Sequence, residues 1–200
     1  MIAWFVPSIY LLLYALLHSV LASQTFKTSV ARYLPLTYYR LIYVLLSLIL
    51  LLPLPFLPLP QGLLYRLPFP GIFYVPQAIG LLGFVWALQH TDLSEFLGWT
   101  QLKRRNAASS QTDENPVLVT TGPYRLCRHP LYFFASLALI AQPVVSKTYA
   151  LITVWTVLYF WIGSYFEERR LIRQFGEAYL NYRTHTPRLI PIPKQKSPAA

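Results

Sequence analysis

Two polar stretches of this apolar chain carry side chains that could do chemistry. The first is a loop, PVLVTTGPYRLCRHPLY, which runs from Pro116 to Tyr132 and leads directly into an apolar segment. The second is the acidic pair Glu167-Glu168, which follows another apolar segment. A helix that begins at Pro130 would offer unpaired backbone N–H groups to an anion, and carboxylates suit a cation. Acids at a membrane boundary are costly, so the pair is a candidate functional site.

Plainer interpretations of both stretches stay open. The loop also fits a basic connector beside a membrane, in which Arg125 and Arg128 face lipid phosphates. The acidic pair also fits carboxylates in water, since Arg169, Arg170 and Arg173 follow it closely.

The histidines give weaker signals. His90 is a candidate catalytic base where a third apolar segment ends, while Asp92 fits a helix cap with Glu95 at the third position. His18, inside the first apolar segment, fits a hydrogen-bonded packing residue. The sequence has no pair of histidines four residues apart and no CxxC, and its single cysteine is Cys127. We therefore expect no metal site and no internal disulfide.

Composition defines the class of protein that must position these residues. The chain has 200 residues, of which 55% are hydrophobic and only 12% charged. A soluble domain carries about 25% charged residues, so this chain is predicted to be an integral membrane protein. Its net charge of +10 could suggest nucleic acid, but an anionic lipid leaflet is the simpler partner, and no nucleic acid is expected.

Apolar periodicity predicts an all-α membrane protein with about five transmembrane helices, because a span needs about 20 apolar residues. The segments are Ile2–Ala22, Arg40–Leu59, Ile72–His90, Pro130–Ser146 and Thr148–Phe166. The fourth is short and contains Pro143, and with Lys147 as the turn it is predicted to form a tight helical hairpin with the fifth. The proline-rich stretch from Pro53 to Pro60 is expected to leave the second helix as an extended collar.

Charge asymmetry predicts the orientation of these spans. With alternating topology, 15 of the 17 basic residues fall on one side, and only Arg66 and Lys147 fall on the other. The positive-inside rule then places the N-terminus outside and the C-terminus in the cytoplasm, in the bacterial inner membrane. All acidic residues and all four histidines also lie on the cytoplasmic side in this topology. A retained first span is expected rather than a cleaved signal peptide.

After the fifth span the sequence predicts a cytoplasmic amphipathic helix that continues without a break. Its apolar stripe comprises Leu171, Phe175, Tyr179 and Tyr182. Residues 1–191 are predicted to form a single domain, with the cofactor-binding half at about 115–191 and a mobile tail at 192–200.

The motifs resemble a known family. GPYRLCRHPLY, followed after one hairpin by EERRLIRQFGEAYLNYRTHTPRLIP, is similar to the isoprenylcysteine carboxyl methyltransferase and phospholipid methyltransferase superfamily. HSVLAS, YYRLIYVLLS and QHTDLSEFLGWTQL resemble its NnrU-like and methanethiol S-methyltransferase-like branch. The resemblance implies methyl transfer from S-adenosylmethionine to a small or lipophilic acceptor, such as a thiol, an isoprenylcysteine or a lipid, at the cytoplasmic membrane face.

The resemblance also implies which residues bind the cofactor. These are Pro116, Val117, Leu118, Val119, Tyr124, His129, Pro130, Leu131, Tyr132 and Glu167. One position departs from the family pattern, because isoprenylcysteine enzymes carry an arginine for the substrate carboxylate where this chain has Gly163. That departure argues against a carboxylate-bearing acceptor. Whether sulfur, oxygen or nitrogen is methylated is left open, as is the oligomeric state.

Two other classes of protein were weighed against an enzyme. A non-catalytic NnrU-like membrane protein could retain the same fold, but the intact Glu167, His129 and Tyr132 argue against a degenerate cofactor site. A small transporter is disfavoured, because the chain has no internal repeat and no charge in the middle of a span.

Overall fold

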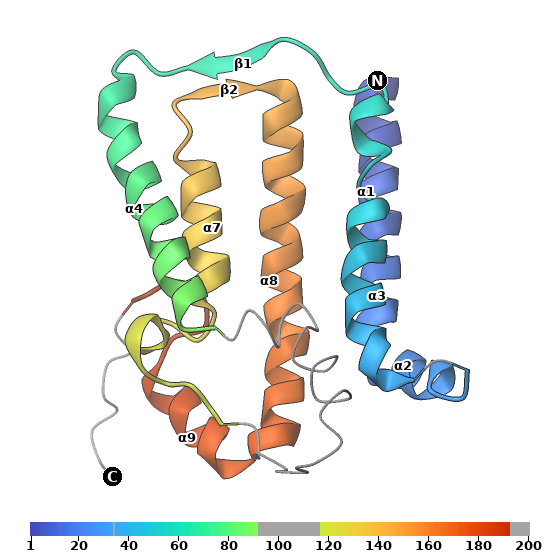
Figure 1. Cartoon of the computed structure of the whole chain (residues 1–200). Helices are drawn as coiled ribbons and strands as arrows, with labels where there is room; N and C mark the ends of the chain where they lie inside the picture. The colour runs from blue at the N-terminus through green and yellow to red at the C-terminus, as the bar shows by residue number, and fades with distance from the viewer. Residues whose placement is uncertain (34, 92–116, 193–200) are drawn as a thin grey trace. The chain divides into compact units, whose positions relative to one another are not determined.

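The computed structural model describes residues 1–33, 35–91 and 117–192 (Figure 1). They divide into two compact units, the first made of residues up to Gln61 and the second of residues 62–91 and 117–192. Every residue discussed below as part of the site lies in the second unit.

The first unit is a helical hairpin with a proline-rich exit. Helix α1 spans Ile2–Ala22, the short helix α2 spans Gln24–Val30, and α3 spans Leu36–Ile49. Ser23 starts α2 by accepting a hydrogen bond from the backbone N–H of Phe26 at 3.2 Å. After α3 the chain keeps only a 3-10 turn, η1, at Leu54–Phe56. Regular helix therefore stops before the prolines, as predicted, since proline removes a backbone donor and clashes with the preceding turn. The collar expected at Pro53–Pro60 is not extended throughout, because it contains this 3-10 turn.

The second unit is built from three long elements joined at one end by a small sheet. Strand β1 (Leu63–Arg66) pairs antiparallel with β2 (Val144–Ser146), and these strands lead into α4 (Pro70–Gln89) and α8 (Lys147–Phe175), respectively. Helix α7 (Pro130–Ile140) returns the chain toward this sheet. The end of α4 and the start of α7 thus lie at the opposite end of the unit from the sheet (Figure 1).

Helices α4 and α7 pack through small residues. Gly80, Gly83 and Ala87 are buried on α4, and a Cβ atom built at Gly83 would overlap the ring of Phe134. Small residues let two backbones approach closely, which is how helices commonly associate in lipid. This packing places the start of α7 next to the end of α4.

Within the described residues, four helical segments are long and apolar enough to cross a membrane. They are Ile2–Ala22, Tyr38–Phe56, Pro70–Gln89 and Lys147–Phe175. The predicted fourth span, Pro130–Ser146, is wrong as a continuous helix, because α7 ends at Ile140 and Val144–Ser146 form β2. Pro143 lacks the N–H that a helix would need there, and its carbonyl instead accepts from Leu67 at 3.0 Å. The tight helical hairpin is corrected accordingly: Ser146 caps α8 through Tyr149, and a strand rather than Lys147 alone makes the connection.

The C-terminal helix is not continuous either. Helix α8 ends at Phe175, Gly176 adopts φ 55°, and α9 spans Glu177–His185. Glycine tolerates a positive φ that other residues rarely adopt, so it ends α8 and redirects the chain. The residues expected to form one apolar stripe therefore lie on two helices.

Candidate functional site

The site begins at the start of α7, where His129 is the N-cap residue and Pro130 the first helical residue. Among the described residues, no side chain caps this helix. The first amides of a helix have no partner within it, and Pro130 has no N–H to satisfy. The amides of Leu131 and Tyr132 are therefore oriented to bind an anion at this point.

Glu167 of α8 faces the start of α7. The Tyr132 hydroxyl donates to its Oε2 at 2.9 Å, and Nδ1 of His129 lies 3.5 Å from the same oxygen. The other oxygen, Oε1, lies 3.4 Å from the Arg170 guanidinium on the exposed surface. The Tyr132 ring stacks on His129 at 5.4 Å and on Phe160 at 4.8 Å, which fixes the direction of its hydroxyl. Glu167 is thus held in place while its side chain remains 31% exposed.

Glu168, one residue along, is enclosed. Its Oε1 accepts from Nε of Arg128 at 2.7 Å and also from Nη2 of the same guanidinium. The Glu168 and Arg128 side chains are 7% and 5% exposed, respectively, so this is a buried ion pair. Arg183 of α9 approaches the other oxygen, with its Nε 3.8 Å from Oε2.

His129 lies between the two carboxylates. Its Nδ1 faces Glu167, and its buried Nε2 lies 3.7 Å from Oε1 of Glu168 without a hydrogen bond. Burial by itself lowers the pKa of His129, but the two carboxylates outweigh burial and raise that pKa above its ordinary value of 6.5. The two carboxylates therefore favour the cationic form of the imidazole.

Hydrogen bonds also connect the turn η2 (Gly122–Arg125) to the end of α4 and to α9. The Tyr124 hydroxyl lies 3.1 Å from the Thr91 hydroxyl, and the Tyr182 hydroxyl donates to the Tyr124 carbonyl at 2.6 Å. Burial raises the pKa of Tyr124, and the charge on Glu167 raises it further. Tyr124 therefore lies within electrostatic range of Glu167.

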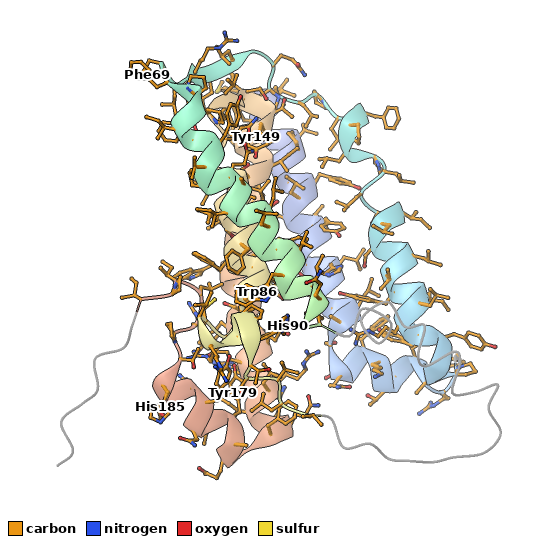
Figure 2. The ribbon with its side chains drawn as sticks, turned by 60° about the vertical axis from the view of Figure 1, so that its left-hand side comes forward. Phe69, Trp86, His90, Tyr149, Tyr179 and His185 are labelled. Carbon is orange, nitrogen blue, oxygen red and sulfur yellow. The ribbon has the colours of Figure 1, made fainter. Side chains whose placement is uncertain are left out.

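His90 packs against the same turn. Gly122 has φ 59°, and a Cβ atom built there would lie only 2.5 Å from Cδ2 and Nε2 of His90. Nδ1 of His90 lies 3.0 Å from the carbonyl of Trp86. A carbonyl can only accept, so Nδ1 carries the proton and the neutral ring keeps a free electron pair at Nε2. Figure 2 shows His90 and Tyr179 at one end of the unit, and Phe69 and Tyr149 at the other.

The structure places the predicted site residues as follows. His129, Pro130, Leu131, Tyr132 and Glu167 come together at the start of α7, and Tyr124 lies nearby. Val117, Leu118 and Val119 form irregular chain before η2, with Val117 83% exposed. Pro116, Asp92 and Glu95 lie outside the described residues.

Sequence analysis named Glu168 only as half of the acidic pair, and it gave Arg128 and Tyr182 no role in the site. Both residues belong to recognisable motifs, since Glu168 is half of the acidic pair and Arg128 precedes His129. The ion pair between them could not be predicted from the sequence, because the two residues lie 40 positions apart.

Other reactive side chains in the described part of the chain do not form a separate centre. No group of three or more His, Cys, Asp or Glu residues within it could hold a metal ion. Cys127 is fully buried, and burial raises its thiol pKa to about 11. A thiol in that state is a poor nucleophile, because the thiolate is the reactive form.

Comparison with known proteins identifies similar chains. The phospholipid methyltransferase family model matches residues 96–178, which include η2, α7 and most of α8. A methanethiol S-methyltransferase of Bradyrhizobium diazoefficiens is 30% identical over 187 residues, covering 90% of this chain and 70% of that protein. Another methanethiol S-methyltransferase, from a Pseudomonas species, is 30% identical over 203 residues, which cover 95% of this chain and 74% of that protein.

A shorter stretch of the chain is similar to an isoprenylcysteine methyltransferase. The mouse protein-S-isoprenylcysteine O-methyltransferase is 36% identical over 95 residues, which are 44% of this chain and 32% of that protein. No solved structure matches the chain. The relatives that match over most of the chain are named as enzymes, which favours the enzymatic prediction over the non-catalytic alternative.

Proposed function

This chain belongs to the isoprenylcysteine carboxyl methyltransferase and phospholipid methyltransferase superfamily and is a membrane methyltransferase, and on that premise we propose that it methylates a thiol using S-adenosylmethionine. The observation that carries the proposal is the constrained, partly exposed Glu167 beside the uncapped start of α7. The choice of a thiol as the acceptor rests on two further observations, which are given below.

The described residues fit the cofactor. Glu167 offers a fixed carboxylate to the cationic groups of S-adenosylmethionine, and this carboxylate also contacts His129 and the surface Arg170. The first amides of α7, those of Leu131 and Tyr132, suit a carboxylate group. Tyr124 adds an aromatic wall within electrostatic range of Glu167. Val117, Leu118, Val119 and Pro116 complete the proposed binding residues.

The bound cofactor supplies a methyl group that its positively charged sulfur already activates. The chain's own task is then to hold the acceptor in line and close to that group, and this alignment is a large part of catalysis. A thiol acceptor must also lose its proton, because the pKa of a simple thiol is about 8.5. His90 is the proposed base, since its Nε2 holds the free electron pair while Nδ1 donates to the Trp86 carbonyl.

Two observations favour a thiol over a carboxylate-bearing acceptor. The relatives that match most of the chain are named for methanethiol, whereas the isoprenylcysteine enzyme matches only 44% of it. Gly163, where the isoprenylcysteine enzymes carry arginine, has open space around it and no cationic side chain of its own. A neutral or apolar thiol needs no such cation.

The membrane setting completes the proposal. We propose the bacterial inner membrane, with the N-terminus outside and the site on the cytoplasmic side, where the positive-inside rule puts the basic C-terminal residues. A lipophilic acceptor would reach the site laterally from the bilayer.

The test is methyl transfer by the purified full chain in lipid nanodiscs. Radiolabelled S-adenosylmethionine is supplied with methanethiol, longer alkyl thiols, a prenylcysteine and an amino lipid. We expect labelled thioether from the simple thiols and little from the prenylcysteine. Labelling of the amino lipid alone would contradict the thiol assignment, and absence of S-adenosylhomocysteine binding in a calorimetric titration would contradict the cofactor assignment. Asp92→Asn should spare that binding.

A further inference from the structure

The two neighbouring glutamates of the acidic pair are in different environments. Glu167 is 31% exposed, and one of its oxygens lies near the surface Arg170. Glu168 is only 7% exposed, and its oxygens face Arg128, His129 and Arg183. Successive residues of a helix point about 100° apart, so one side chain can face a ligand while the next faces the interior. The pair is therefore divided between two tasks.

Arg128 donates its remaining hydrogen bonds to the end of α9 and to the residue after it. Its Nη1 donates to the Arg183 carbonyl at 3.2 Å and to the Thr186 carbonyl. Those carbonyls belong to the last turn of α9 and the residue after it, where helical acceptors have no partner within the helix. One guanidinium thus connects the α8 carboxylate to the end of α9, across 40 and 58 positions of sequence.

The chain after α9 returns along the start of α7. We call Thr186–Leu189 the return segment. The backbone N–H groups of Arg128 and His129 donate to the carbonyls of Pro187 and Arg188 at 2.9 and 3.1 Å. Leu189 is buried, and the guanidinium of Arg188 lies 4.7 Å from the centre of the Trp161 ring on α8. The return segment therefore supports the backbone that carries His129.

His129 depends on the same arrangement. Its backbone is fixed by Arg188, one ring nitrogen faces Glu167, and the other faces the oxygen of Glu168 that already accepts from Arg128. A movement of Glu168 would release the Arg128 guanidinium and leave a buried charge without its partner. Removing one partner of a buried ion pair is strongly destabilising for this reason.

We propose that Glu168 is a positioning residue: with Arg128 it fastens the return segment to the start of α7 and keeps His129 beside Glu167, so that of the two glutamates only Glu167 contacts the cofactor. The division of roles within the acidic pair rests on the proposed cofactor site. The fastening itself concerns only contacts within the protein and holds without a ligand.

The first measurement needs no ligand. Hydrogen exchange of the Arg128 and His129 amides is compared in the full-length wild type, in Glu168→Gln and in Glu177→Gln, which removes an exposed carboxylate from α9. Hydrogen bonds to charged groups contribute enough that their loss should speed exchange at least about tenfold in Glu168→Gln. Glu177→Gln should exchange like the wild type. Equal exchange in the two variants would overturn the proposal.

A second pair of variants covers the case in which Glu168→Gln folds poorly. Arg128→Met leaves Glu168 buried without its partner, whereas Arg128→Met combined with Glu168→Met removes both charges. Apolar replacements of a whole buried pair are often tolerated. The double variant should therefore be more heat-stable than Arg128→Met alone, and the reverse order would contradict a buried pair.

The third measurement separates positioning from contact. Glu168→Gln should lower the pKa of His129 measured by NMR, and it should weaken S-adenosylhomocysteine binding less than Glu167→Gln does. An affinity loss equal to that of Glu167→Gln, with unchanged amide exchange, would make Glu168 a ligand and reject the proposal. If the wild type binds no S-adenosylhomocysteine, the cofactor assignment fails, while the exchange and stability results still decide the positioning role.

Discussion

Two histidines in the two units of this protein show how partners determine a residue's chemistry. In the first unit, Nδ1 of His18 lies 2.9 Å from the Ser47 hydroxyl, Nε2 lies 2.6 Å from the Tyr43 hydroxyl, and the ring stacks on Tyr14 at 5.6 Å. In the second unit, both ring nitrogens of His129 face carboxylates. The first histidine joins α1 to α3 through neutral groups, whereas the second is poised to carry charge.

The contrast explains why only one of the two belongs to a proposed reaction centre. Neutral hydroxyls satisfy a neutral imidazole completely, so His18 gains nothing from ionising inside an apolar hairpin. This confirms the prediction that His18 is a hydrogen-bonded packing residue. Carboxylates favour imidazolium, and a fixed charge beside a partly exposed glutamate can organise a polar ligand.

The largest effect should come from removing the exposed carboxylate of the charged cluster. Glu167→Gln keeps the shape but loses the charge, so S-adenosylhomocysteine binding should weaken by about 10- to 100-fold, the range for hydrogen bonds to charged groups. Isothermal titration calorimetry of the detergent-purified protein measures the affinity for S-adenosylhomocysteine. Glu177→Gln, which also removes one carboxylate, is the matched control and should bind like the wild type. Equal affinity in wild type and Glu167→Gln would remove the basis for treating this cluster as the site.

Replacing each of the two histidines by alanine tests the comparison directly. His129→Ala should weaken S-adenosylhomocysteine binding by about tenfold, because it leaves Glu167 and Glu168 facing each other without the intervening cation. His18→Ala should leave that affinity within about twofold, since its partners are neutral and lie in the other unit. A larger loss of affinity in His18→Ala than in His129→Ala would reverse the contrast between the two units.

The next largest effect should come from the turn at Gly122. Gly122→Ala combines a positive φ with a collision against His90, so we expect about 1–3 kcal/mol of lost stability and a lower methyl-transfer rate. Gly71→Ala is the control, because a Cβ atom there meets no neighbour within 4 Å. Thermal unfolding of both variants measures the stability, and an unchanged melting temperature in Gly122→Ala would show that the turn yields without strain.

The pH dependence of stability should separate the two histidines. The groups facing His129 are Glu167 and Glu168 from α8, Tyr132 from α7 and the adjacent Arg128. The pKa of His129 is raised on folding, so its contribution to stability is complete below the ordinary value of 6.5 and is lost as pH rises through the raised value. Melting temperatures from about pH 6 to about pH 9 should fall less steeply in His129→Ala than in the wild type. In His18→Ala the fall should be no flatter than in the wild type, and a flattened slope there would assign the titration to the wrong histidine.

The smallest effect should come from the neutral cluster. Ser47→Ala removes one hydroxyl from His18 and should cost about 1 kcal/mol of stability, the usual contribution of a neutral hydrogen bond. Thermal unfolding at one pH measures it, and methyl transfer should be unchanged. A loss of activity larger than the loss of folded protein would show that the first unit contributes to the chemistry.

Much of this protein follows from its sequence. The apolar segments determine a helical membrane protein, because the bilayer requires about 20 apolar residues per span and satisfies no backbone group. The prolines after α3 and Gly176 mark helix ends locally, although Gly176 was overlooked as a break. The motif around His129 and the acidic pair identify the family and the candidate site, since the side chains themselves carry the chemistry.

Only the tertiary structure shows which groups surround each of these side chains. Residue type alone does not distinguish Glu167 from Glu168, and only the family resemblance singled out Glu167. In the structure, Arg128 and Arg183 lie beside Glu168. Likewise, α7 ends at Ile140 because the following residues pair with β1, a strand more than 70 positions earlier. Contacts between residues far apart in the chain depend on how the helices pack, and no local pattern of residue types encodes that packing.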